Sequence, residues 1–294
     1  MDEPKVVLSD LVVGESPRWH EGRLWFCNWG AHEIIAVDPD GNAEVVLRDA
    51  EVDPHSIDWL PDGRMLIVPK NTERGRLLRR EPNGDIVSHA DLSGLPSGFN
   101  EIVVDGRGNV YVNGADFDFL SFISTLDHTD QRPLHLRPGF VPGFIALITP
   151  DGRSRIVAED IAFPNGMLVT PDNATLIISE SFAGRLSAFD VAADGGLSGR
   201  RVWAEGLGPD GICRDADGAV WTSSGETDCV RVAEGGEILD RVDFDRSPFA
   251  CMLGGPERRT LYVVAATWNP ENPFGGRTGQ LLAVPAPAAG VGWP

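Results

Sequence analysis

Six copies of one short pattern run along this chain. Each copy has an apolar run, a turn that contains Asp, Gly or Asn (or, in the last copy, Arg), and a second apolar or aromatic run. The copies occupy residues 17–26, 57–68, 102–112, 168–178, 212–222 and 252–263. Their turns lie about 41, 45, 65, 45 and 40 residues apart, and strand–turn–strand units with such a period are typical of propeller blades. The pattern therefore predicts an all-β fold, a six-bladed β-propeller.

The glycine and proline content agrees with many short strands. The 34 Gly and 22 Pro are spread along all 294 residues, and no segment shows the sustained periodicity of an amphipathic helix. All-β chains of this length often form one domain. We therefore expect a single propeller domain over residues 1–294, with an inserted loop at about 116–143.

The inserted loop separates the third and fourth copies and is rich in aromatic residues. It contains Phe117, Phe119, Phe122 and Phe140, together with three prolines. Long connections inside a compact domain are usually functional or mobile. We interpret the loop as an excursion over one face of the propeller that acts as a lid. A surface loop packed by its own aromatic side chains is the alternative.

The charge of the chain excludes some classes of partner. A formal net charge of -19 repels phosphate backbones, which argues against nucleic-acid binding. No apolar run approaches the roughly 20 residues that span a bilayer, so we expect no membrane role. The first residues are acidic and no apolar stretch follows them, so we expect no signal peptide and a cytoplasmic location.

The cysteines carry no metal-binding or redox motif. They lie far apart and without CxxC spacing, at Cys27, Cys213, Cys229 and Cys251. In a cytosolic protein such residues are usually buried, reduced thiols. We expect no disulfide and no metal cluster from them.

Polar residues stand directly before four of the copies. They are Glu15, Asn100, Asn165 and Asp210. The innermost strands of a propeller begin around one axial channel, so residues at these matching positions should converge there. Two carboxylates and two amide oxygens suit hard cations, and the lack of histidine weakens the case for a dedicated zinc site. Asn-Gly and Asp-Gly pairs are also ordinary turn formers, which is the alternative for Asn165 and Asp210.

We therefore expect one divalent metal ion in a central site of the propeller. Ca²⁺ is the first expectation, and Zn²⁺, Mg²⁺, Mn²⁺ and Fe²⁺ are the alternatives.

Several short motifs carry a family resemblance. They are GESPRW at 14–19, FNE at 99–101, FPNGM at 163–167, PDGI at 209–212 and CMLGGP at 251–256. With them the chain resembles the senescence marker protein (regucalcin)/gluconolactonase-like family over nearly its whole length. The resemblance implies that Glu15, Asn165 and Asp210 are the metal ligands. It also implies that Asn100 contacts the substrate or completes the metal site.

The chain departs from the family pattern at three positions. Sugar lactonases similar to regucalcin often carry Arg where this chain has Gly98, and that Arg contacts sugar hydroxyls. The acidic residue after Asn100 is Glu101 rather than Asp, and Glu180 replaces another Asp. These changes leave the metal ligands in place and put a gluconolactone-like substrate in doubt. We predict weak activity on gluconolactone relative to less hydroxylated lactones.

The ligand set and the resemblance together predict a hydrolase. A metal-activated water would attack the carbonyl of a small lactone, either a sugar lactone or a similar cyclic ester. Asp210 is the candidate general base, because a ligand carboxylate keeps a free oxygen for a proton. Asn100 would orient the substrate. His55, Glu101 and Trp29 are further candidates for substrate contact.

Other functions fit the same residues. One alternative is an organophosphate or aryl-ester hydrolase that uses the same metal site, and another is a calcium-binding or ligand-binding propeller without turnover. A third is related propeller chemistry such as cyclisation or condensation. Fold does not decide between these functions. We expect a small-molecule lactone or ester substrate and a monomer or weak homo-oligomer.

Overall fold

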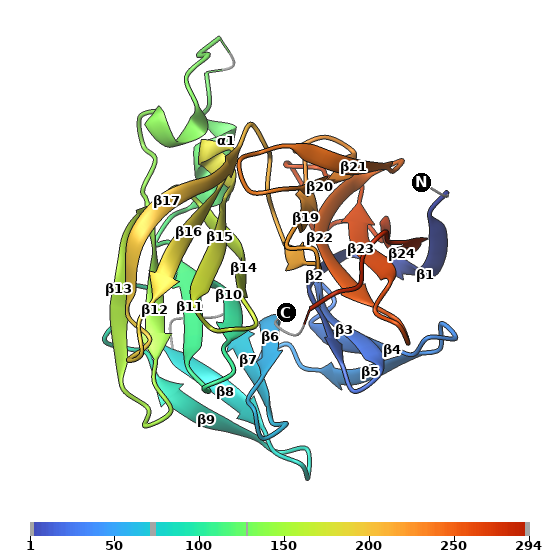
Figure 1. The fold of residues 1–294 in the computed structure, drawn as a ribbon, viewed down its shortest axis with the longest axis horizontal. Coiled ribbons are helices and arrows are strands. Elements are labelled where there is room, and N and C mark those ends of the chain that lie inside the picture. Colours follow the sequence, from blue (N-terminus) through green and yellow to red (C-terminus); the bar gives the residue numbers. More distant parts are fainter. Residues whose placement is uncertain (1–2, 71–74, 128, 292–294) are drawn as a thin grey trace.

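The computed structural model describes residues 3–70, 75–127 and 129–291 of the chain. Strands in these ranges form six four-stranded sheets, arranged as blades around one axis (Figure 1). Neighbouring blades contact one another through their first strands, such as β2 with β22 and β10 with β14. The predicted all-β, six-bladed propeller is confirmed.

The first three blades follow one another along the chain, each from the inner to the outer strand. Blade 1 contains β2 (Val13–His20), β3 (Arg23–Trp29), β4 (Glu33–Val37) and β5 (Ala43–Arg48). Blade 2 contains β6 (Pro54–Trp59), β7 (Met65–Pro69), β8 (Arg76–Arg80) and β9 (Ile86–Asp91). Blade 3 contains β10 (Phe99–Val104), β11 (Val110–Gly114), β12 (Gly143–Ile148) and β13 (Ser154–Ile161).

The next two blades repeat this order. Blade 4 contains β14 (Pro164–Val169), β15 (Thr175–Glu180), β16 (Arg185–Val191) and β17 (Leu197–Glu205). Blade 5 contains β18 (Cys213–Arg214), β19 (Val220–Ser223), β20 (Asp228–Val232) and β21 (Ile238–Asp243).

Blade 6 closes the ring with strands from both ends of the chain. Its order is β22 (Ser247–Gly254), β23 (Thr260–Ala266), β24 (Gly279–Pro285) and then β1 (Lys5–Leu11). β1 runs antiparallel to β24, with Lys5 opposite Ala283 and Leu11 opposite Gly279. This pairing joins the two ends of the propeller, and the repeat pattern did not reveal it because β1 belongs to no hairpin of its own.

Each inner hairpin turns at the residue that marks the sequence repeat. These residues have left-handed backbone angles, with φ of 76°, 85°, 81°, 56°, 93° and 55° at Gly22, Gly63, Gly108, Asn173, Gly218 and Arg258. Glycine and asparagine adopt this conformation at low cost. The turn residues therefore select tight hairpins and place the strand that follows each of them.

The core lies between the blades, where both faces of the middle strands are covered. In β15, for example, Leu176, Ile177 and Ile178 are exposed by 1% or less although they are consecutive. Burying each such side chain contributes about 1.5–3 kcal/mol relative to leaving it in water. All four cysteines are free and buried, as expected.

The loop at 116–143 connects β11 to β12 and rises above the ring near the label α1 (Figure 1). It contains the short helix α1 (Phe119–Ser124), which is capped by the Asp118 side chain, and the 3₁₀ turn η2 (Leu134–Leu136). His128 in this loop lies outside the described residues. A second 3₁₀ turn, η3 (Ser181–Ala183), follows β15. None of the helices described is long and apolar enough to cross a membrane.

Candidate functional site

One residue from the beginning of each blade lines a single cavity on the axis. The six are Glu15, His55, Asn100, Asn165, Asp210 and Phe249, and the cavity has a volume of about 650 Å³. In five blades a β-bulge at this point interrupts the pairing of the innermost strand with its neighbour. A bulge bends the strand and re-aims a side chain. The repeated bulge therefore explains why residues from remote parts of the chain face one another.

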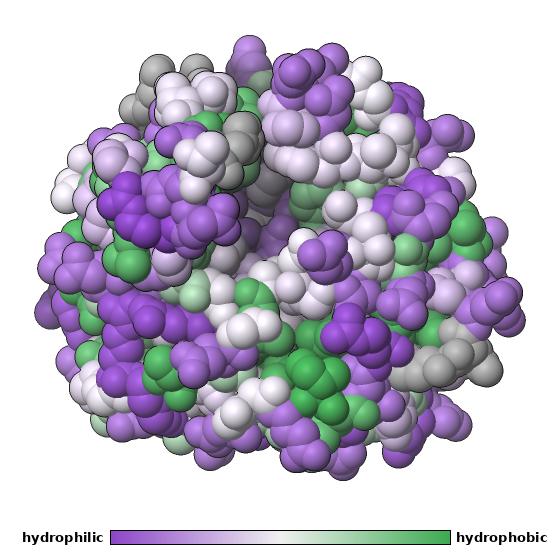
Figure 2. Space-filling model, turned by 90° about the horizontal axis from the view of Figure 1, so that it is seen from above, coloured by the Kyte–Doolittle hydropathy of each residue, from purple (hydrophilic) through white to green (hydrophobic). Residues whose placement is uncertain are grey.

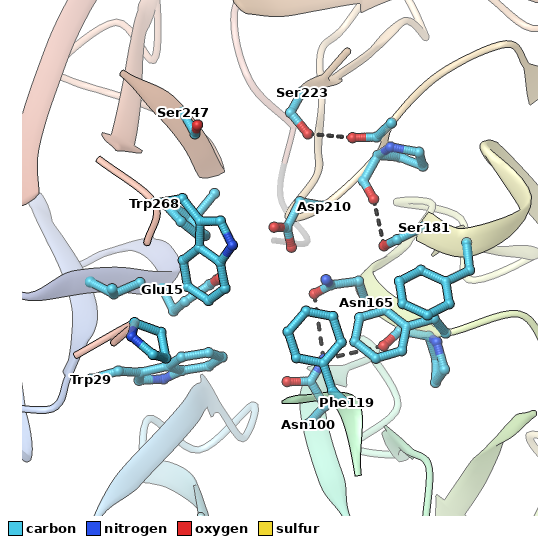
Figure 3. A pocket seen from close by; sticks show the side chains of 18 of the residues that line it. Glu15, Trp29, Asn100, Phe119, Asn165, Ser181, Asp210, Ser223, Ser247 and Trp268 are labelled. Atoms are coloured by element: carbon cyan, nitrogen blue, oxygen red, sulfur yellow. Dashed lines mark hydrogen bonds between the residues drawn. The ribbon is translucent and has the colours of Figure 1, made fainter. Parts of the chain in front are cut away.

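The cavity opens as a hollow on the upper face of the molecule (Figure 2). Glu15, Asn165 and Asp210 lie around its floor, with Asn100 beside them (Figure 3). His55 and Trp29 also line it. Of the seven residues predicted for the site, the structure thus brings six to one cavity.

Glu101 is the exception. Its carboxylate lies beneath the cavity, where it accepts hydrogen bonds from Arg18 at 2.7 Å, from Ser16 at 3.1 Å and from Ser56. Glu101 is 5% exposed and is not among the residues that line the cavity. The prediction of a substrate contact at this residue is corrected accordingly, because the bulge after Phe99 turns Asn100 toward the cavity and Glu101 below it.

Two carboxylates on the cavity floor are only partly compensated, Glu15 by the Ser16 N–H and the charge of Arg18, and Asp210 by the Gly211 N–H. Burial raises the pKa of Glu15 well above its ordinary value, and the negative charges of Asp210 and Glu101 raise it further. Burial and the charge of Glu101 also raise the pKa of Asp210. The Oδ1 atom of Asp210 is buried and has no hydrogen-bond partner among the described residues. Neither carboxylate takes part in a salt bridge within the described part of the chain.

A bound cation would neutralise the negative charge of these two carboxylates and so stabilise their ionised forms. No group of three or more His, Cys, Asp and Glu side chains in the described ranges is arranged to hold a metal. The candidate set differs from such a group because it combines two carboxylates with amide oxygens. Oxygen donors of this mixed kind suit Ca²⁺ and Mg²⁺. The residues present therefore fit a hard divalent cation.

The two asparagines are oriented by their neighbours. Asn100 Nδ2 donates to the carbonyl oxygen of Pro164 at 3.2 Å and lies 3.4 Å from Asn165 Oδ1. His55 Nε2 lies 3.1 Å from Asn100 Oδ1. Asn113 Nδ2 donates to the backbone oxygen of Asn165 at 2.6 Å. These contacts turn the oxygen of Asn165 toward the same space as the carboxylates.

His55 is held as a neutral ring. It stacks on Trp29 with ring centroids 3.7 Å apart, and Trp29 Nε1 donates to the His55 carbonyl oxygen at 2.7 Å. Burial and the charge of Lys70 lower the pKa of His55 to about 3, against the opposing effect of its hydrogen bond to Asn100. A neutral imidazole whose Nε2 carries the proton can donate to the amide oxygen of Asn100. We therefore assign His55 to the orientation of Asn100.

Three serine hydroxyls hold the backbone that carries Asp210. Ser223 Oγ donates to the carbonyl oxygen of Gly208 at 2.6 Å. Ser181 Oγ donates to that of Pro209 at 2.6 Å, and Ser179 Oγ to that of Asp210 at 2.7 Å. Three consecutive carbonyl groups are thus fixed by side chains from β15, β19 and η3. Sequence reasoning missed these serines because nothing in their own segments points to residues 208–210.

Gly98 occupies a position that a larger side chain could not share. Its φ is +79°, and a Cβ atom there would lie 2.0 Å from the carbonyl oxygen of Ala115. The backbone around residue 98 is therefore shaped for glycine, and no side chain from this position reaches the cavity.

Glu180 lies outside the cavity. Its fully buried carboxylate pairs with Arg185 and Arg200 and accepts from the backbone N–H of Ala162 at 2.9 Å. These contacts join strands and loops of blade 4, so the departure at this position concerns stability.

A second connection contributes to the cavity and was not predicted. It joins β23 to β24 and supplies Trp268, Pro273 and Phe274. Trp268 packs against Phe249 with ring centroids 5.5 Å apart. The only signal was an aromatic, Pro- and Gly-containing stretch between two apolar runs, and such a stretch is also what an ordinary surface loop looks like.

The part of the chain that forms this cavity matches a known family. A model of the SMP-30/Gluconolactonase/LRE-like region matches residues 13–267, which include all six blade-entrance residues. The chain belongs to this family. The resemblance expected from the motifs is thereby confirmed.

One curated relative and two solved structures match most of the length of the chain. A pentonolactonase of Haloferax volcanii is 26% identical over 279 residues, which cover 90% of this chain and 86% of that protein. The structure of a gluconolactonase from Xanthomonas campestris is 21% identical with a TM-score of 0.73, over 97% of this chain and 89% of that one. The structure of a calcium-binding protein, regucalcin, from Agrobacterium tumefaciens is 20% identical with a TM-score of 0.75, over 98% and 95%. At these identities the structural likeness establishes the fold.

Proposed function

We propose that this chain hydrolyses a small lactone with the help of one divalent cation held by Glu15, Asn165 and Asp210. The observation that carries the proposal is the pair of buried carboxylates in one cavity, neither of them in a salt bridge and with Asp210 Oδ1 lacking a hydrogen-bond partner among the described residues. Relatives named pentonolactonase and gluconolactonase support lactone opening as the reaction.

Ca²⁺ remains our first expectation for the ion. The donors are all oxygen atoms, and a relative from Agrobacterium tumefaciens is named as a calcium-binding protein. Mg²⁺, Mn²⁺, Fe²⁺ and Zn²⁺ are the alternatives. When bound, such a cation polarises a carbonyl group and lowers the pKa of a coordinated water.

The side chains of this protein then have separate roles. Glu15 supplies negative charge that neutralises the cation. Asp210 Oδ1, which no protein donor occupies, accepts the proton of the attacking water. Asn100, fixed by His55, sets the position of the substrate next to Asn165. A bound substrate displaces water from the cavity, which strengthens each of these electrostatic interactions.

The second candidate function is hydrolysis of an aryl ester or organophosphate at the same site. The observation that favours it is the aromatic lining above the carboxylates, which suits apolar substrates. A propeller that binds calcium or a ligand without turnover is the third candidate. We also propose that the chain acts as one domain, as a monomer or weak homo-oligomer, in the cytoplasm.

One experiment separates these candidates. The purified protein is analysed for bound metal, stripped with chelator, reloaded with each of the five ions, and assayed on lactones, aryl esters and phosphotriesters. We expect lactone hydrolysis that disappears on chelation and returns with Ca²⁺. Metal binding without turnover of any substrate would support the binding module, and activity that survives complete metal removal would refute the proposal.

A further inference from the structure

Above the carboxylates, one wall of the cavity is made of phenylalanines. Phe119 of helix α1 packs against Phe163 and Phe182, with ring centroids 5.1 Å and 6.1 Å away. Phe163 and Phe182 stack on each other at 4.3 Å. Phe182 is 8% exposed and thus belongs to the blade, whereas Phe119 is half-buried and forms the inner surface of the loop. The wall is therefore anchored to blade 4 while its upper ring faces the cavity.

The opposite wall comes from blade 6 and the connection between β23 and β24. Trp268 packs on Phe249, and Phe274 lies under the ammonium group of Lys70, which is 4.2 Å from the ring centroid. Trp268 and Phe119 face the cavity from different sides, and Glu15 lies next to Trp268 in this view while Asp210 lies toward blade 5 (Figure 3). Two flat aromatic surfaces thus flank the approach to the candidate metal site.

Lys70, Glu226 and Ser247 are polar residues of the cavity lining, but other polar groups of the described lining are already engaged. The hydroxyl protons of Ser181 and Ser223 are donated to backbone carbonyls. Position 98 offers no side chain at all. A sugar lactone would bring several hydroxyl groups against aromatic surfaces that cannot satisfy them, and burying an unpaired hydroxyl costs free energy. An apolar ring would instead replace water on both walls.

From this geometry we propose that the substrate is a lactone carrying a flat apolar ring, of aromatic size, which inserts between Phe119 and Trp268. The inference rests on the proposed function and specifies its substrate class. The ester carbonyl then lies toward Glu15, Asn165 and Asp210. Water oxygen bonds to the acyl carbon and the acyl–oxygen bond breaks. One proton of the water ends on the released hydroxyl group and the other on the carboxylic acid, which ionises.

Three six-membered lactones test the substrate class. They are valerolactone, its benzo-fused analogue isochromanone with a benzylic ring oxygen, and gluconolactone. The first two release alkoxides of similar basicity, so their comparison reports binding of the aromatic ring. We expect isochromanone to have a KM at least about tenfold below that of valerolactone, with gluconolactone the poorest of the three. A preference for gluconolactone, or equal KM values for the first two, would overturn the proposal.

Variants of the two walls locate the effect. Phe119→Ala and Trp268→Ala should each raise the KM for isochromanone about tenfold more than they raise the KM for valerolactone. Leu136→Ala in the same loop and Glu271→Ala in the second connection are the matched controls, because neither residue lines the cavity. Wall variants that behave like these controls would refute insertion of the substrate ring between Phe119 and Trp268, the two walls of the aromatic slot.

Direct binding distinguishes this inference from the proposed function. The lactam that corresponds to isochromanone is not hydrolysed, so calorimetric titration measures its affinity whether or not the protein is an enzyme. We expect the metal-loaded protein to bind this lactam at least about tenfold more tightly than valerolactam, and the Trp268→Ala variant to lose the difference. Binding of the aromatic lactam without hydrolysis of any lactone would support the slot and refute lactonase activity. Equal affinity for the two lactams would refute the slot alone.

Discussion

The Ser181 hydroxyl donates a 2.6 Å hydrogen bond to the carbonyl oxygen of Pro209, the residue that precedes Asp210. Ser181 itself follows directly after β15, so this bond ties the candidate metal ligand to the second strand of the neighbouring blade. Mutation of a group that orients a metal ligand in this way typically weakens metal affinity by about 10–100-fold. The bond therefore links a structural feature of blade 4 to the chemistry proposed for blade 5.

We predict that Ser181→Ala weakens metal affinity by about tenfold or more while the propeller stays folded. The loss leaves the Pro209 carbonyl free to move, and Asp210 with it. Calorimetric titration of the protein with metal measures the affinity, and circular dichroism checks the fold. Ser198→Ala, at an exposed serine of β17, is the control and should change neither. An unchanged affinity in Ser181→Ala would show that Asp210 does not depend on this contact.

The site was predictable where its residues follow a local rule. Glu15, Asn165 and Asp210 occupy the same position relative to a hairpin whose turn chemistry is visible in the sequence, and the fold brings equal positions together. The repeat alone thus predicted both the blades and the convergence of these side chains. Strand β1 was missed because its partner β24 lies at the other end of the chain.

The positions of Glu101 and Trp268 could not be predicted, because they depend on contacts between segments that share no sequence pattern. Glu101 was expected in the cavity but does not line it, because the bulge after Phe99 changes the direction of successive side chains. A bulge leaves no clear mark in the sequence. Trp268 reaches the cavity only through the path of its connection. No local property of these residues distinguishes a wall of the site from a surface loop.

Replacing Asp210 tests the ligand set itself. We predict that Asp210→Ala retains no metal and no hydrolytic activity, because the cation loses one of its two carboxylates. In the absence of metal the variant should be at least as resistant to heat as the unmodified protein, since repulsion with Glu15 is relieved. Metal analysis and thermal unfolding measure the two effects. Asp151→Ala, at an exposed turn, serves as the control, and full activity in Asp210→Ala would rule out the proposed mechanism.

Glu180 should make the stability of the propeller depend on pH in the acid range. Burial raises the pKa of this carboxyl, but hydrogen bonds from Arg185, Ser187, the Ala162 backbone and Arg200 outweigh burial and lower the pKa from 4.5 to about 2. Because the folded pKa lies below the unfolded one, the ionised form stabilises the fold. That contribution is complete above about pH 4.5 and is lost as the pH falls toward 2.

Glu180→Gln should therefore lower the free energy of unfolding at neutral pH by up to about 3 kcal/mol and much less near pH 2. Urea unfolding at a series of pH values between neutrality and the acid limit measures the difference between variant and unmodified protein. Glu159→Gln, at an exposed neighbour, is the control. A destabilisation that stays constant across the series would mean that lost packing, rather than the charge, accounts for the effect.

Gly98 supplies the last test, which concerns why this chain lacks the family's Arg. We predict that Gly98→Ala lowers the free energy of unfolding by about 2–4 kcal/mol, because the new Cβ would lie 2.0 Å from the Ala115 carbonyl oxygen in a left-handed backbone. Gly152 has a similar φ of +82° with open space around it, so Gly152→Ala reports the backbone strain alone, about 1–2 kcal/mol. Urea unfolding of the two variants measures the difference. Equal destabilisation would show that the loop at residue 98 yields to a side chain, and an Arg introduced there would then be free to enter the cavity.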